Sequence, residues 1–358
     1  MTPGPSEPYP EALLAQSYRL YKHYGDEWLE IYKQWMEYAL KLFGAGDGYV
    51  IPFYGSASAA MEMVLNSIDR GKILFINDGF FVRRFKEISL IYGHEAHHVI
   101  PEEIGKRVYL DEVSALLNSD DFKAVVVVHS ETSTGVLEDL EGIRGVTPDD
   151  TLLIVDSVSS YGAMRINVGE VDIDICIGYS SKALGGVMGV TPVYIKEDIV
   201  DKVVRRSGYR GFYNDLKTWI EYREKWPFHP YPTTIPTNAI LAFNTAAEIV
   251  LSEGLDRVER RHIGISKYVY GELSRVDGLE PVPDEGARSP TVSVLWCRSR
   301  SPDDVVEYVK SRYGYMISTA LFAGLEAIRI GHMGYTAQMR FVYPVVEAIK
   351  EFFASCGG

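Results

Sequence analysis

Five short runs rich in valine, isoleucine and leucine constrain what this chain can fold into more than any other feature. Stretches with helical spacing separate most of them, and the runs lie at residues 72–76, 124–128, 152–155, 173–177 and 190–195. Continuous apolar runs, rather than strict alternation with polar residues, are typical of strands that are covered on both faces. The pattern therefore predicts an α/β fold in which helices wrap a central sheet.

The length of 358 residues predicts more than one structural unit, because a single hydrophobic core stops growing beyond about 250–300 residues. We predict an N-terminal arm over residues 1–14, a large domain over 15–253 and a small α+β domain over 254–358. The arm is rich in proline and lacks periodicity, so we expect it to be extended and to lie outside the core. Apolar spacing and breakers predict further elements: helices at 27–43, 237–252, 255–275, after Pro302 and at 336–353, and a strand at 291–296.

The composition excludes several classes of protein. A net charge of -13 argues against nonspecific binding to nucleic acid or to anionic lipid, since both need a basic face. No segment approaches the ~20 consecutive apolar residues that span a bilayer, so we expect no membrane insertion. The N-terminus lacks the basic and apolar regions of a signal peptide, and three cysteines are too few for a disulfide framework. We therefore expect a cytoplasmic protein.

Polar residues follow several of the apolar runs, at the ends where ligands gather in open α/β sheets. Asp156 closes the run 152–155, and Lys182 follows the run 173–177 after two serines. A lysine is rarely buried without a partner, but it suits the task of holding a carbonyl cofactor. The lysine and the aspartate together suggest pyridoxal phosphate, with Lys182 for the Schiff base and Asp156 for the pyridinium nitrogen.

A third polar cluster, Gly55 to Ser58, follows the run 49–53 and opens a helix. Small residues let the backbone approach a ligand, and a helix N-terminus attracts anions, so the cluster predicts a phosphate site. A simple helix cap would have the same sequence. By contrast, His94, His97 and His98 lack the spacing of a zinc-binding helix, and we expect no metal.

Five segments in the same order resemble the class V aminotransferases, and most of all the alanine/serine–glyoxylate aminotransferase group. The resemblance implies the fold type I of pyridoxal phosphate enzymes: a large domain around a mostly parallel seven-stranded-type sheet and a small C-terminal domain. The segments are Gly55-Ser56-Ala57-Ser58, His129-Ser130-Glu131-Thr132-Ser133-Thr134-Gly135, Val155-Asp156-Ser157-Val158-Ser159-Ser160, Ser180-Ser181-Lys182-Ala183-Leu184 and Arg329-Ile330-Gly331-His332-Met333-Gly334.

The resemblance also implies the roles of single residues towards the cofactor. Lys182 would carry the cofactor as a Schiff base and move the substrate's α-proton, and Asp156 would keep the ring nitrogen protonated. Thr132 would donate to the phenolic oxygen. Phe81 would stack on the ring, although its neighbour Phe80 is an alternative. The expected phosphate ligands are Ser56, Ala57, Ser58 and Ser181.

Other implied contacts concern the substrate and a second subunit. Arg329 would bind the substrate's α-carboxylate, with a backbone amide from Gly4. His23 matches part of a segment that approaches the substrate, but the missing arginine beside it leaves the side-chain preference open. Tyr231 and Thr234 match positions that reach the phosphate of the neighbouring subunit, which implies a homodimer with shared active sites. A domain linker would have the same composition.

The predicted activity is a transaminase of ping-pong form. It would move an amino group from a small L-amino acid, of the alanine or serine type, to a 2-oxo acid such as glyoxylate or pyruvate. One alternative is a cysteine desulfurase-like or other class V lyase, which needs a reactive cysteine ahead of Arg329, where residues 315–324 contain none. The other alternative is a catalytically silent subunit that retains the fold.

Overall fold

A computed structural model of the chain describes residues 1–203 and 208–355. Its larger part is built around a seven-stranded sheet in the order β1-β9-β8-β7-β4-β2-β3. Only β9 runs against the other strands, so the sheet is mostly parallel. The strands are β1 (Tyr49–Tyr54), β9 (Val190–Ile195), β8 (Ile175–Ile177), β7 (Leu152–Asp156), β4 (Phe122–Val128), β2 (Lys72–Ile76) and β3 (Glu95–Val99).

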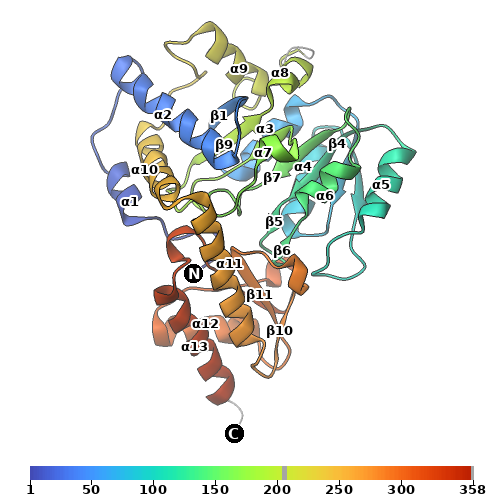
Figure 1. Cartoon of the computed structure of the whole chain (residues 1–358), viewed down its shortest axis with the longest axis vertical. Coiled ribbons are helices and arrows are strands. Elements are labelled where there is room, and N and C mark those ends of the chain that lie inside the picture. The colour runs from blue at the N-terminus through green and yellow to red at the C-terminus, as the bar shows by residue number, and fades with distance from the viewer. Residues whose placement is uncertain (204–207, 356–358) are drawn as a thin grey trace.

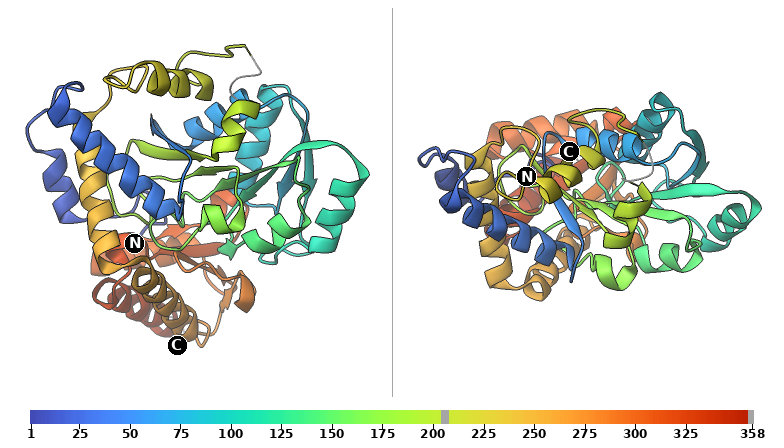
Figure 2. Two further views of the ribbon diagram at one scale, coloured as in Figure 1. Left: turned by 45° about the horizontal axis from the view of Figure 1, so that its top comes forward. Right: turned by 90° about the horizontal axis from the view of Figure 1, so that it is seen from above.

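Helices cover this sheet because its strands are apolar on both faces. Every residue of β9 is buried, and so are the residues of β8. On one part of the sheet α3 (Ala57–Ser67) and α4 (Phe80–Ile91) pack together, and α2 (Asp26–Phe43) packs with α10 (Thr237–Glu253) beside β9 (Figure 2). The remaining helices of this part are α5 (Leu110–Ser119), α6 (Leu140–Val146), α7 (Val168–Val171), α8 (Glu197–Val203) and α9 (Leu216–Lys225).

The C-terminal part forms a second layer of helices and sheet below the first (Figure 1). Four antiparallel strands occur in the order β10-β11-β13-β12. Their apolar faces pack with those of three helices around a core of their own. The elements are β10 (Leu279–Pro281), β11 (Val292–Cys297), β12 (Ser318–Thr319), β13 (Ala327–Gly331), α11 (Leu255–Leu273), α12 (Pro302–Tyr313) and α13 (Met339–Ser355). The boundary predicted at residue 254 falls between α10 and α11, and its status as a domain boundary stays a prediction.

The N-terminal segment differs from its prediction. Residues 10–16 form a helix, α1 (Pro10–Gln16), rather than an extended arm, and Ala12 is fully buried in the core. The chain before α1 lies between the two parts of the molecule (Figure 1). There Met1 accepts a hydrogen bond of 2.8 Å from the amide of Gly331, and the amide of Tyr9 donates one of 2.8 Å to Gly185. The segment is therefore fixed to both parts.

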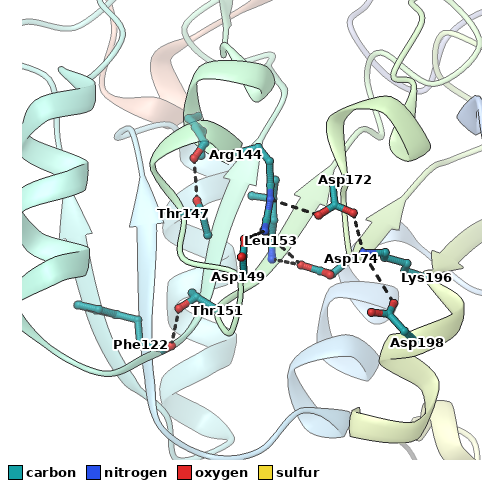
Figure 3. Close-up of polar contacts among 11 residues, drawn as sticks. Phe122, Arg144, Thr147, Asp149, Thr151, Leu153, Asp172, Asp174, Lys196 and Asp198 are labelled. Carbon is teal, nitrogen blue, oxygen red and sulfur yellow. Dashed lines mark hydrogen bonds and ion pairs between the residues drawn. The ribbon is translucent and has the colours of Figure 1, made fainter.

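A network of ion pairs stabilises the amino-terminal edge of the sheet, away from the site described below (Figure 3). Arg144 of α6 lies 3.5 Å from Asp172 and 3.8 Å from Asp174, and Lys196 lies 2.6 Å from Asp172. Asp174 is buried and accepts a hydrogen bond of 2.7 Å from the amide of Leu153, at the start of β7. The network joins the starts of β7 and β8 to the end of β9.

Candidate active site

A cavity of about 560 Å³, including the part open to solvent, lies at the carboxyl edge of the seven-stranded sheet. Parallel strands end at one edge, which is where ligands bind in folds of this kind. In register, Val128 at the end of β4 pairs with Asp156 at the end of β7. The lining residues are Ser56, Ala57, Ser58, Met61, Phe81, Val128, Ser130, Asp156, Val158, Ser159, Tyr179 and Lys182.

Asp156 presents a buried carboxylate to this cavity. It is 3% exposed, and within the described part of the chain its carboxylate accepts one hydrogen bond, of 2.8 Å from the amide of Val158. Burial raises the pKa of Asp156 to about 7, because the charged form has lost its water without gaining a cationic partner of its own. The site therefore favours a ligand that brings a positive hydrogen-bond donor to this carboxylate.

Lys182 projects into the same cavity from the turn after β8. The turn is closed by hydrogen bonds from the amide of Gly186 to Ser180 and from the amide of Gly185 to Lys182. Desolvation and the charge of Arg329 lower the pKa of the Lys182 amine, and Asp156 and Glu131 raise it, so that the pKa is about 8. A substantial share of neutral, nucleophilic amine is thus present near pH 8.

The N-terminal segment covers Lys182. The amine donates a hydrogen bond of 2.6 Å to the carbonyl oxygen of Pro3, and the Ser6 hydroxyl donates one of 2.5 Å to the carbonyl of Lys182. Gly4 has a φ of +140°, and a Cβ atom at this position would lie 2.1 Å from the lysine Nζ. Glycine alone fits there. The structure thus brings Gly4 to the lysine, and a contact of its amide with the substrate stays a prediction.

The predicted phosphate cluster forms the N-terminus of α3 and lines the cavity. The Ser56 hydroxyl caps the helix by accepting a hydrogen bond of 3.3 Å from the amide of Ala59. Within the described chain the amides of Ala57 and Ser58 have no protein acceptor, as is usual for a first helical turn. The Arg84 guanidinium donates to the Ser58 hydroxyl at 3.3 Å. The cap predicted from this sequence is therefore present, and a phosphate site at this helix N-terminus stays a prediction.

Of the two candidate aromatic rings, Phe81 and Phe80, only that of Phe81 lines the cavity. Phe81 lines it, with the Lys182 amine 5.8 Å from the ring centroid. Phe80 points elsewhere and packs edge-on against Phe322, at 4.7 Å between centroids. Consecutive residues on a helix face different directions, so only one of the two can reach the site.

Arg329 and Thr132 lie together beside the cavity without lining it. Arg329 Nη1 donates a hydrogen bond of 3.1 Å to the carbonyl of Thr132, and its Nε donates one of 2.8 Å to the carbonyl of Thr319. Burial lowers the pKa of Arg329 to about 10. Thr132 itself is 1% exposed. The charge of the Arg329 guanidinium lowers the pKa of the Lys182 amine. A contact of Thr132 with the phenolic oxygen of the cofactor stays a prediction.

Besides Gly4, Thr132 and Arg329, four predicted residues do not line the cavity: Ser181, Tyr231, His23 and Thr234. Ser181 is buried, and its hydroxyl has no hydrogen-bond partner among residues 1–203 and 208–355. It lines a neighbouring hollow that it shares with Gly4. Tyr231 is fully buried, accepts a hydrogen bond of 2.7 Å from the Trp28 indole and donates to the carbonyl of His23.

His23 packs 5.4 Å from the ring of His229, away from Lys182, and Thr234 is exposed. A contact of His23 with substrate, or of Tyr231 and Thr234 with a neighbouring subunit, stays a prediction. In the single chain the Tyr231 hydroxyl already accepts one hydrogen bond and donates another.

Glu131, Ser130 and Arg84 have no individual role predicted from the sequence. Glu131 is 2% exposed and accepts hydrogen bonds from the amides of Phe81 and Ser133, at 3.0 and 2.9 Å. The sequence does contain one signal for Glu131: it is an acidic residue in a hydroxyl-rich stretch that follows a strand. The signal did not identify the partners, because they come from α4 and from the turn.

The mostly parallel seven-stranded sheet and the C-terminal antiparallel sheet are arranged as in the fold type I aminotransferases. The chain belongs to the class V aminotransferase family, whose profile matches residues 7–339. It is 33% identical to an uncharacterized aminotransferase of Methanocaldococcus jannaschii over 93% of this chain and 87% of that one.

Two further relatives have names that state their substrates. The chain is 28% identical to the alanine–glyoxylate aminotransferase of Mus musculus, over 99% of this chain and 87% of that one. The crystal structure of the ureidoglycine–glyoxylate aminotransferase of Bacillus subtilis superposes with a TM-score of 0.91 at 26% identity, covering 100% of this chain and 93% of that one.

The described cysteines do not fit the desulfurase alternative. Cys176 and Cys297 are both buried, and burial raises the pKa of each thiol to about 12. A thiol of this kind is a poor nucleophile. Cys356 lies outside the described residues. No helix in the described ranges is long and apolar enough to cross a membrane.

Proposed function

We propose that this protein is a pyridoxal phosphate-dependent transaminase that moves an amino group from a small L-amino acid to a 2-oxo acid such as glyoxylate or pyruvate by a ping-pong mechanism. The observation that carries the proposal is the presence of Lys182 and Asp156 in one cavity, with Arg329 beside it. The family supplies the reaction class, and the names of the relatives above support the choice of substrates.

The residues at the site fit this cofactor. Asp156 is a buried carboxylate in need of a cationic partner, which a protonated pyridine nitrogen provides. Phe81 offers a ring face for stacking. The free amides of Ala57 and Ser58 and the hydroxyl of Ser56 form a cradle for phosphate. When bound, pyridoxal phosphate supplies a carbonyl that accepts the amino group and a ring that accepts electrons.

Each residue then has a defined task. Lys182, whose amine is partly neutral near pH 8, holds the cofactor and moves the proton at the substrate's Cα as general base and acid. Asp156 holds the proton on the ring nitrogen. Arg329 binds the α-carboxylate and so orients the Cα–H bond towards Lys182. Pro3 and Gly4 close the cavity over the lysine and keep it small, which favours small substrates.

We also propose a homodimer and a cytoplasmic location. The dimer rests on the match of Tyr231 and Thr234 to residues that act across an interface in the family, and the exposure of Thr234 is compatible with it. The location rests on the cysteine content, since three cysteines are too few for the disulfide framework of a secreted protein.

Half-reaction spectra test the function. Purified protein with added pyridoxal phosphate is expected to show a visible absorption band, which alanine, serine or glycine bleaches and glyoxylate or pyruvate restores. After borohydride reduction the cofactor should be found on Lys182 by mass spectrometry, and Lys182→Ala should retain none. A protein that takes up no pyridoxal phosphate would overturn the proposal, and bleaching only by other donors would change the substrate class.

A further inference from the structure

Glu131 is a buried carboxylate at the point where two loops of the site meet α4. It ends β5 (Ser130–Glu131), the short strand after β4. A Cβ atom on Gly79 would lie 2.1–2.3 Å from atoms of the Glu131 side chain, so only glycine at position 79 leaves room for it. A buried carboxylate is costly unless it is hydrogen-bonded, and here the partners belong to the active site.

The first partner is the segment that holds the aromatic ring. Gly79, the N-cap of α4, has no side chain to satisfy the first amides of the helix. The 131–133 turn supplies the acceptors instead: Glu131 Oε2 accepts from the amide of Phe81 at 3.0 Å, and the Ser133 hydroxyl accepts from the amide of Phe80 at 3.0 Å. A negative charge is also favourable at this end of a helix. The position of the Phe81 ring therefore depends on Glu131.

The second partner is the turn that holds the arginine. Glu131 Oε1 accepts a hydrogen bond of 2.9 Å from the amide of Ser133, which fixes the peptide groups around Thr132. The Thr132 carbonyl is one of two that receive Arg329. Among the ion pairs of the described residues none pairs Arg329 with a carboxylate, and Glu131 is the acid whose charge acts on it.

The charge of Glu131 reaches Lys182 as well. Three charged groups act on this amine: Arg329 lowers its pKa, whereas Asp156 and Glu131 raise it. The site thus holds two cations and two buried carboxylates. When a ligand binds Asp156, Glu131 is the carboxylate whose charge still acts on Lys182 and Arg329.

We propose that Glu131 is a positioning residue of this active site, whose carboxylate sets the Phe81 ring and the Arg329 guanidinium and balances the charge of Lys182. This inference rests on the proposed function, because it assigns Glu131 a task towards the cofactor and substrate of that reaction.

The test compares Glu131→Gln with Glu138→Gln. Glu138 is a matched control, since it is 4% exposed, lies on the same segment and bonds Asn77, yet it is not among the charges that act on Lys182. The first measurement is the pH midpoint for uptake of pyridoxal phosphate, followed by absorbance. Loss of the Glu131 charge should move the midpoint down by about one pH unit, whereas Glu138→Gln should leave it in place.

Glu131→Asp distinguishes the effect of the carboxylate charge from the effect of the side-chain length. It retains the charge but is one methylene shorter, so its pH midpoint should stay near that of the wild type. The ring and arginine should be less well placed, which predicts altered circular dichroism of the bound cofactor and roughly a tenfold higher KM for the amino donor. If Glu131 were purely structural, both Glu131 variants would lower thermal stability without moving either readout.

The possible failures are distinguishable. If the wild type takes up no pyridoxal phosphate, the proposed function falls. If it does, and Glu131→Gln matches Glu138→Gln in midpoint and KM, the inference about Glu131 is wrong. If Glu131→Gln does not fold, Glu131→Asp decides: wild-type dichroism and KM in that variant would overturn the inference.

Discussion

Gly4 and Lys182, separated by 178 positions in the sequence, are in direct contact: a Cβ atom on the glycine would lie 2.1 Å from the lysine Nζ. The neighbouring Pro3 carbonyl accepts the hydrogen bond of the same amine. The N-terminal segment therefore forms one wall of the site, and the position of the amine depends on it.

Gly4→Ala should displace this wall. The added methyl meets Lys182, and alanine rarely adopts a φ of +140°. We expect a loss of stability of about 1 kcal/mol and a clear loss of transaminase activity. Thermal unfolding and kcat/KM measure the two effects. Gly46→Ala, at a position with open space around it, is the control and should change neither. Full activity in Gly4→Ala would show that the segment is not part of the site.

Uptake of pyridoxal phosphate should depend on pH through Lys182. The pKa of this amine is lowered to about 8, and only its neutral form attacks the aldehyde. The rate should therefore rise with pH and level off above about pH 8. Stopped-flow absorbance at about five pH values between 6 and 10 measures the rate of uptake. A midpoint near the ordinary lysine value of 10.5 would contradict the desolvated site.

Asp156→Asn should stabilise the cofactor-free protein while weakening its binding of the cofactor. The pKa of Asp156 is raised from 3.8 to about 7, so the unfolded chain loses this proton first, and stability falls as pH rises through that window. Asparagine carries no charge, so we expect on the order of 1 kcal/mol more stability above pH 7. Denaturant unfolding at pH 5 and pH 8 should show a clearly larger difference at the higher value, because pH 5 lies near the lower end of that window. An equal effect at both would mean that ionisation is not the cause.

Arg329→Gln should raise the KM for amino donors by about 100-fold, because a charge-assisted pair with the substrate carboxylate is lost. An amine without a carboxylate should be affected far less. Arg298→Gln is the control, since Arg298 pairs with Glu280 on the surface of the same small sheet. Steady-state kinetics with both donor types decide the matter. Equal losses for both would indicate that Arg329 acts through the fold and not through the carboxylate.

Arg144→Ala should destabilise the fold without changing the KM for substrates. It removes the ion-pair partner of the buried Asp174 at the amino-terminal edge of the sheet, for a cost of about 2 kcal/mol. The half-exposed Arg165, which pairs with Glu259 and Asp256, is the comparison. Its replacement by alanine should cost less than about 1 kcal/mol. Denaturant unfolding measures both, and equal costs would contradict the importance of burial.

Local sequence patterns predicted most of the large sheet. The runs at 72–76 and 190–195 are strands with the predicted bounds, because a continuous apolar run of that length can only be satisfied by burial on both faces. The run at 173–177 is a strand only over 175–177. The edge strand β3 (Glu95–Val99) was missed, since its glutamate is exposed, its histidines are part-exposed and its sequence has no apolar run.

The sequence by itself determined the alternation of strands and helices and the polar residues at the carboxyl ends of strands, including Asp156 and Lys182. These are properties of near neighbours along the chain, set by side-chain period and by backbone punctuation. The tertiary structure alone decided that Phe81 rather than Phe80 faces the cavity, that residues 1–6 cover Lys182 and that Glu131 supports the site. Those contacts join segments about 50 to 180 positions apart in the sequence. Which segments meet depends on how the whole chain packs, so a local sequence pattern cannot predict it.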